Sequence, residues 1–179
     1  MVQLILSKTS PTNTTLNDSH NTLVYEVSTP RSFGGGTTTI KRNGQVLATI
    51  KWGVFGSGEL TMGGVTSSLS EAFPKAGMLS KSRVFTTANG EKLKWKNKSK
   101  LSCVSGDSGK PLATYNRKRF ATIRNKKSTL DISSYGAHLT DILVVTWVIA
   151  EKKAQDRKNA GGGDDGGGDG GGDGGGGGC

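Results

Sequence analysis

Cysteine and histidine are scarce in this sequence, which limits its redox chemistry and its metal chemistry. The 179 residues include two cysteines, Cys103 and Cys179, and two histidines, His20 and His138. Two cysteines cannot build a disulfide framework or a zinc cluster. The chain also lacks a Gly-rich phosphate loop and a paired-acid motif. We therefore predict a non-enzymatic domain with no metal site and no cofactor.

Long hydrophobic runs are missing as well. The longest apolar run, residues 142–150, is about half as long as a membrane-spanning helix. The N-terminal MVQLILSKTS has no basic segment before its short apolar run, so it does not resemble a signal peptide. We expect no transmembrane segment and an intracellular location, most simply the cytoplasm, with peripheral membrane association left open.

One stretch of the sequence resembles a catalytic motif. GDSGKP, at Gly106–Pro111, is close to the sequence around the nucleophile of chymotrypsin-like proteases. A catalytic serine needs a base and a group that orients that base. His20 would be the base in the protease chain order, but the only Asp between it and Ser108 is Asp107, the immediate neighbour of the serine. Because Ser-Gly-Asp-Ser-Gly suits a loop between strands, we interpret Ser108 as a loop residue. A serine hydrolase that uses Ser108 and His20 is a remote alternative.

From Val2 to about Ser134 the pattern is that of β-structure. Short segments rich in β-branched and aromatic residues alternate with Gly, Asn, Pro and Ser. Asn-Gly pairs at 43–44 and 89–90 are typical of type I′ hairpin turns. The predicted strands are Val2–Ser7, Leu23–Ser28, Thr37–Arg42, Gln45–Trp52, Glu59–Met62, Arg83–Thr87, Lys92–Asn97, Lys100–Val104, Leu112–Asn116, Phe120–Arg124 and Thr129–Ser133.

The segment Leu139–Lys158 differs from the rest. It is apolar on nearly all sides up to Ala150 and then becomes charged. Its valines argue for a strand, whereas its length, Asp141 near its start and its basic end favour a helix. A helix that is apolar all round must be buried on all sides. A helix inside a closed barrel would meet that requirement.

The end of the chain is of low complexity. From Gly161 on, it contains Gly and Asp with a final Cys179 and no apolar side chain for a core. We predict a flexible coil there. The chain is thus divided into one domain at residues 1–158 and a disordered tail at 159–179.

Positive charge is the strongest functional signal. The formal net charge is +10, and residues 1–160 hold all 24 Lys and Arg against 10 Asp and Glu. Such a surface favours polyanions, although it also serves solubility and protects strand edges. Alternate lysines from position 92 share one face of an extended strand. The candidate anion-binding residues are Lys92, Lys94, Lys96, Lys98, Arg117, Lys118 and Arg119.

The predicted partner is an anionic membrane surface, with phosphoinositide as the ligand, or an acidic protein. Nucleic acid is disfavoured, because Trp95 is the one aromatic residue within the lysine run and single-strand binders need a stacking platform. The alternative is a protein-interaction scaffold whose charge serves only solubility.

Five segments in order resemble a group of small fungal domains of unknown function, abundant in mushroom-forming species. The segments are NTTLNDSHNTLVYEVSTP (Asn13–Pro30), TTTIKRNGQVLATIKW (Thr37–Trp52), SRVFTTANGEKLKWK (Ser82–Lys96), KPLATYNRK (Lys110–Lys118) and LTDILVVTWVIAEKKAQDRK (Leu139–Lys158).

That group looks related to the tubby C-terminal, LURP-one-related and scramblase-like proteins. The resemblance implies a mainly β fold, a closed antiparallel barrel around one buried apolar helix near the C-terminus, which would be Leu139–Lys158. It implies no catalytic residues. Tubby-type relatives bind phosphoinositide through basic side chains, but none of these corresponds residue by residue to this chain.

Overall fold

The structure is a computed structural model that describes residues 1–30, 36–53, 57–78, 80–97, 100–118 and 127–160. The predicted strand Phe120–Arg124, the candidates Lys98 and Arg119, and the Gly/Asp tail lie outside the described residues.

Twelve strands form one antiparallel sheet in the described part of the chain. Their order across the sheet is β7-β6-β5-β4-β3-β2-β1-β12-β11-β10-β9-β8, so β12 returns to pair with β1. The strands are β1 Val2–Leu6, β2 Thr14–Asn17, β3 Leu23–Ser28, β4 Thr37–Arg42, β5 Gln45–Trp52, β6 Gly58–Met62, β7 Val65–Ser68, β8 Arg83–Thr86, β9 Lys92–Asn97, β10 Leu101–Ser105, β11 Pro111–Asn116 and β12 Thr129–Ile132.

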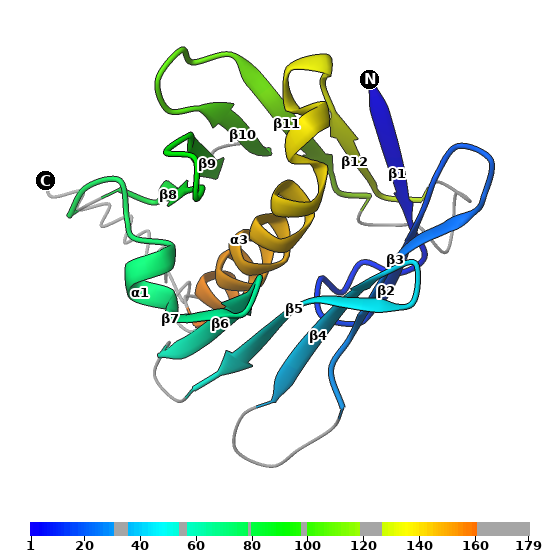
Figure 1. The fold of residues 1–179 in the computed structure, drawn as a ribbon, viewed down its shortest axis with the longest axis horizontal. Helices are drawn as coiled ribbons and strands as arrows, with labels where there is room; N and C mark the ends of the chain where they lie inside the picture. The colour runs from blue at the N-terminus through cyan, green and yellow to red at the C-terminus, as the bar shows by residue number, and fades with distance from the viewer. Residues whose placement is uncertain (31–35, 54–56, 79, 98–99, 119–126, 161–179) are drawn as a thin grey trace, which may run out of the picture.

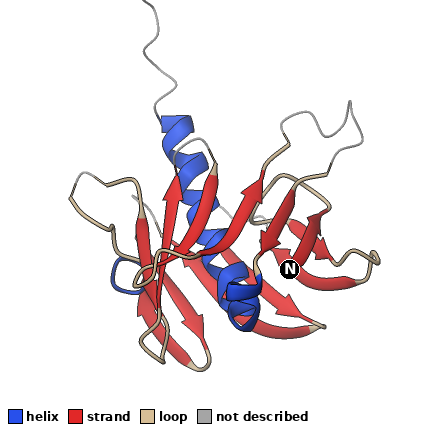
Figure 2. Ribbon diagram, turned by 90° about the horizontal axis from the view of Figure 1, so that it is seen from above, coloured by secondary structure: helices blue, strands red, loops and turns tan. Residues whose placement is uncertain are grey.

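The sheet curls around a single long helix, α3, Thr140–Ala160, which follows a short 3-10 helix, η2, Ser134–Leu139 (Figures 1 and 2). Every residue from Leu143 to Glu151 is buried, as expected for a helix with apolar side chains on all sides. The prediction of a buried helix near the C-terminus is confirmed. The helix begins one residue later than predicted and ends two residues later.

The two edges of the sheet are β7 and β8, which do not pair with each other in the described part of the chain. Between them lie the one-turn helix α1, Leu69–Ala72, and the segment after it, in which Lys75 forms a bridge with Arg83. The predicted closed barrel is therefore not confirmed. The sheet wraps around the helix without being closed by hydrogen bonds.

Polar contacts fix the helix within the sheet. Trp95 on β9 donates its indole N–H to the Thr146 hydroxyl at 2.9 Å, and Thr146 donates to the Ile142 carbonyl at 2.7 Å. The rings of Tyr115 and Trp147 pack with their centroids 5.2 Å apart. A hydrogen bond between two buried side chains fixes the rotation of α3 more specifically than apolar packing does.

The helix defines two ends of the curled sheet. The entry rim is the end where α3 begins, near the starts of β1, β3 and β5. The exit rim is the end where α3 finishes, near the ends of β9 and β11. At the entry rim, Arg42 donates from Nη1 to both carboxylate oxygens of Asp141 at 2.9 and 2.8 Å, and the Tyr25 hydroxyl donates to the same carboxylate. Asp141 lies in the first turn of α3, where a negative charge is favourable.

The GDSG loop between β10 and β11 also lies at the entry rim. Gly106 donates its N–H to the Lys92 carbonyl, and a Cβ at position 106 would lie 2.6 Å from the Lys92 Cβ. Gly109 has φ +69°, a conformation that favours glycine. Both glycines are thus required by the backbone of this loop.

Candidate functional site

The exit rim holds a small polar hollow of about 250 Å³, called here the exit pocket. It lies between β9, β10, β11 and the C-terminal half of α3. Its lining residues are Asn97, Lys100, Leu101, Tyr115, Asn116, Arg117, Lys118, Glu151, Ala154 and Lys158.

Four cations of the exit pocket come from the ends of three elements. Lys100 immediately precedes β10, and Arg117 and Lys118 immediately follow β11. Lys158 lies in the last turn of α3. The antiparallel register pairs Leu101 with both Asn97 and Tyr115, which brings these strand ends together. Residues far apart in the sequence therefore line one hollow.

Among the described residues, Glu151 is the one carboxylate that lines the exit pocket. It is only 4% exposed, its Oε1 lies 3.4 Å from the Arg117 Nη1, and Gln155 donates to the same oxygen at 2.9 Å. Burial raises the pKa of Glu151, and the nearby Gln155, Arg117 and Lys158 oppose that rise. In the part of the chain that the structure describes, the pocket thus contains four cations and a single acid, Glu151, which is already paired with Arg117.

Tyr115 supplies a neutral donor to the same pocket. The residue is 2% exposed, and its hydroxyl makes no hydrogen bond of ordinary geometry among the described residues, although the Ser128 side chain is close enough to lower its pKa. Burial raises its pKa to about 12, and the charge of Glu151 contributes, while Ser128 and Arg117 oppose the rise. The hydroxyl therefore keeps its proton at neutral pH and can donate a hydrogen bond to an acceptor.

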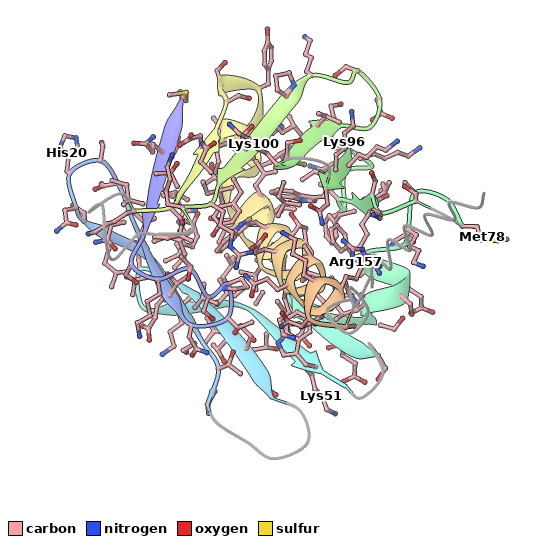
Figure 3. The ribbon with its side chains drawn as sticks, turned by 180° about the vertical axis from the view of Figure 1, so that it is seen from behind. His20, Lys51, Met78, Lys96, Lys100 and Arg157 are labelled. Atoms are coloured by element: carbon pink, nitrogen blue, oxygen red, sulfur yellow. The ribbon has the colours of Figure 1, made fainter. Side chains whose placement is uncertain are left out.

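More cations surround the C-terminal half of α3. Burial lowers the pKa of both Arg83 and Lys153, and Arg157 lowers both further (Figure 3 shows Arg157 on these turns of α3). Lys152 is paired with Asp156 at 2.6 Å, one helical turn away. Cations in the last turns also complement the negative end of the helix dipole, so part of this charge stabilises α3.

The predicted candidate residues divide into two groups. Leu93 and Trp95 face the core, so Lys92, Lys94 and Lys96 lie on the outer face of β9. Arg117 and Lys118 line the exit pocket. The sequence therefore indicated one part of the pocket, whereas the lysines of β9 lie outside it.

Ser108 lies in a different hollow, of about 260 Å³, at the entry rim. His138 and Glu91 also line it, and the His138 Nε2 lies 3.3 Å from Glu91. Among the described residues, neither histidine ring is hydrogen-bonded to Ser108. His20 lies on the side of the molecule opposite Lys96 on β9, the strand next to β10 (Figure 3). The fold does not bring His20 to Ser108.

An apolar hollow of about 470 Å³ lies where β7 and β8 fail to meet. Leu60, Met62, Phe85 and Ile142 contribute to its walls. The residues that the structure describes contain no group of His, Cys, Asp and Glu side chains that could hold a metal ion. Within those residues, no helix is long and apolar enough to cross a membrane.

The fold and the pocket define a mainly β domain with one helix through its curled sheet and a cationic hollow at one end. The chain belongs to a family of unknown function, DUF6593, whose model matches residues 9–156. No curated protein matches the chain. A protein of Arabidopsis thaliana, known from its X-ray structure, is similar at 14% identity over 80% of this chain and 88% of that chain, with a TM-score of 0.46.

Proposed function

We propose that this domain is a non-catalytic module that docks on an anionic membrane surface, with phosphoinositide as the recognised lipid, through its exit rim. The observation that carries the proposal is the exit pocket, which among the described residues has four cations, Lys100, Arg117, Lys118 and Lys158, and a single, already paired acid. Basic side chains near an anionic bilayer contribute about 1 kcal/mol each.

One further observation, together with the sequence resemblance, supports this proposal. Residues 1–160 carry 24 Lys and Arg against 10 Asp and Glu, so the long-range field attracts an anionic surface. The proposal includes a distant relation to the tubby-type proteins and an origin in a mushroom-forming fungus, both implied by the sequence resemblance. Tubby-type relatives bind phosphoinositide with basic side chains.

Co-sedimentation of the full chain with vesicles tests the proposal. Phosphatidylcholine vesicles that contain phosphatidylinositol bisphosphate should pellet the protein, and vesicles of phosphatidylcholine alone should not. Binding should weaken as salt is raised, because exposed charges are screened. Equal binding to both kinds of vesicle would overturn the proposal. A salt-insensitive complex with one acidic protein would favour the scaffold alternative instead.

A further inference from the structure

We infer that the exit pocket is a site for one phosphate group, held by the Tyr115 hydroxyl together with the surrounding cations. The inference deepens the proposed function and rests on it for the source of the phosphate, which would be a lipid headgroup. The site itself would accept the same group on a soluble molecule.

The charge and size of the pocket suit such a ligand. A phosphate monoester carries up to about two negative charges and three acceptor oxygens. The pocket holds four cations, and its volume of about 250 Å³ suits a small group better than an extended polymer. Arg117 offers a planar guanidinium, which binds phosphate oxygens in pairs.

The Tyr115 hydroxyl is the second, independent observation. Buried polar groups almost always have a hydrogen-bond partner in native structures. This hydroxyl is buried among the residues that line a cationic pocket, and in the described part of the chain it makes no hydrogen bond of ordinary geometry, its weaker contact with Ser128 aside. The packing of the Tyr115 ring on Trp147 holds it in place. A phosphate oxygen would accept a hydrogen bond from the Tyr115 hydroxyl and so give this hydroxyl a partner.

Glu151 opposes an anion in this pocket, and that opposition makes the inference testable. A phosphate must compete with the Glu151 carboxylate for Arg117, whose Nη1 lies 3.4 Å from it. Replacing the carboxylate by an amide would remove the competing charge and leave a side chain of the same shape next to Gln155. Glu151→Gln should therefore bind phosphate more tightly than the wild type.

The test uses the full chain and soluble inositol trisphosphate in a calorimetric titration. Tyr115→Phe removes only the hydroxyl, so the fold should persist, as circular dichroism would verify. Loss of a hydrogen bond to a charged oxygen should weaken binding about tenfold. Arg117→Ala should weaken it at least as much. Lys94→Ala, which removes the same charge from the outer face of β9, is the matched control and should change binding less than about threefold.

Four outcomes decide between the two proposals. Weaker binding by Tyr115→Phe, together with tighter binding by Glu151→Gln, supports the pocket. Wild-type affinity in Tyr115→Phe, or equal losses in Arg117→Ala and Lys94→Ala, overturns it. Vesicle binding and inositol trisphosphate binding that are both unchanged in Tyr115→Phe overturn the pocket and leave membrane docking intact. Binding of inositol trisphosphate that depends on Tyr115, without binding to vesicles, supports the pocket and overturns membrane docking.

Discussion

The two ends of α3 use charge in opposite ways. At the entry rim, one carboxylate, Asp141, receives hydrogen bonds from both Arg42 and Tyr25. At the exit rim, Lys100, Arg117, Lys118 and Lys158 share a pocket in which Glu151 is the one acid among the residues described. The entry rim is thus electrostatically satisfied within the fold, whereas the exit rim has cations in excess.

The side chains around the two rims also differ in polarity. Several exposed apolar side chains lie where odd-numbered strands begin at the entry rim: Val2, Leu23, Val46 and Val65. At the exit rim, the residues that flank β10 and β11 include Lys100, Arg117 and Lys118. Charge at the entry rim therefore serves stability, and we expect charge at the exit rim to serve binding. Substitutions at the two rims should separate these two properties.

The largest effect is expected from neutralising the exit pocket. The triple variant Lys100→Ala, Arg117→Ala, Lys158→Ala should bind phosphoinositide vesicles about 100-fold more weakly, at about 1 kcal/mol for each cation. The matched control, Lys92→Ala, Lys94→Ala, Lys96→Ala, removes the same charge from the outer face of β9 and should lose less than about tenfold. Equal losses in a vesicle titration would mean that net charge alone determines binding.

The next effect concerns stability at the entry rim. Asp141→Ala leaves Arg42 and Tyr25 without their shared acceptor, and the buried Tyr25 hydroxyl loses its bond. We expect a loss of about 2 kcal/mol in the free energy of unfolding, measured by urea denaturation. Vesicle binding by the folded fraction should stay within about twofold of wild type. A variant as stable as the wild type would show that these contacts contribute little.

A smaller loss of stability is expected in the GDSG loop. Gly106→Ala places a Cβ 2.6 Å from the Lys92 Cβ, so β9 or the loop must shift, at a cost of about 1–2 kcal/mol in the free energy of unfolding.

Ser108→Ala should change the free energy of unfolding by less than about 0.5 kcal/mol, because the Ser108 side chain is exposed. A fluorophosphonate probe should leave Ser108 unlabelled. Labelling of Ser108 would revive the serine hydrolase alternative and point to His138 as its base.

The smallest effect is a pH dependence at Glu151. Burial raises its pKa above the ordinary value of 4.5, so the folded protein holds this proton more tightly than the unfolded chain does. The group therefore favours folding below pH 4.5, and that contribution is lost as the pH rises through the raised pKa. Urea denaturation should show wild type gaining stability relative to Glu151→Gln as the pH falls from neutral toward 4.5. A constant difference, or the reverse trend, would contradict this assignment.

Much of the sheet could be predicted from local patterns. The bounds of β3, β4, β5 and β9 follow from alternating side chains and Asn-Gly turns. β2 was not predicted, because four residues between polar segments give too little alternation. β7 was not predicted either, because its sequence, VTSS, has one large apolar residue and so shows no alternation. β7 and β8 are separated by α1 and the segment after it. That segment shows neither helical nor strand periodicity in the sequence, so the open edge could not be predicted.

The candidate site could be predicted only in part. Charge alone indicated Arg117 and Lys118, because cationic runs are visible in a sequence. The same reasoning selected Lys92, Lys94 and Lys96, which point to the opposite face of β9 from Trp95 and do not line the pocket. Tyr115 and Glu151 were not predicted as site residues. Their role depends on burial, on the unsatisfied hydroxyl of Tyr115 and on the pairing of Glu151 with Arg117. These features appear only once the chain is folded.

The orientation of the domain on a vesicle tests the central claim most directly. An environment-sensitive dye would be attached to Asn159→Cys, an exposed position beside the exit pocket, or to Val46→Cys at the entry rim, each in a Cys179→Ser background. The remaining Cys103 is buried, and burial raises its pKa, so it should not react. Phosphoinositide vesicles should shift the emission of the dye on residue 159 and leave that on residue 46 unchanged. A shift confined to residue 46 would contradict docking through the exit rim.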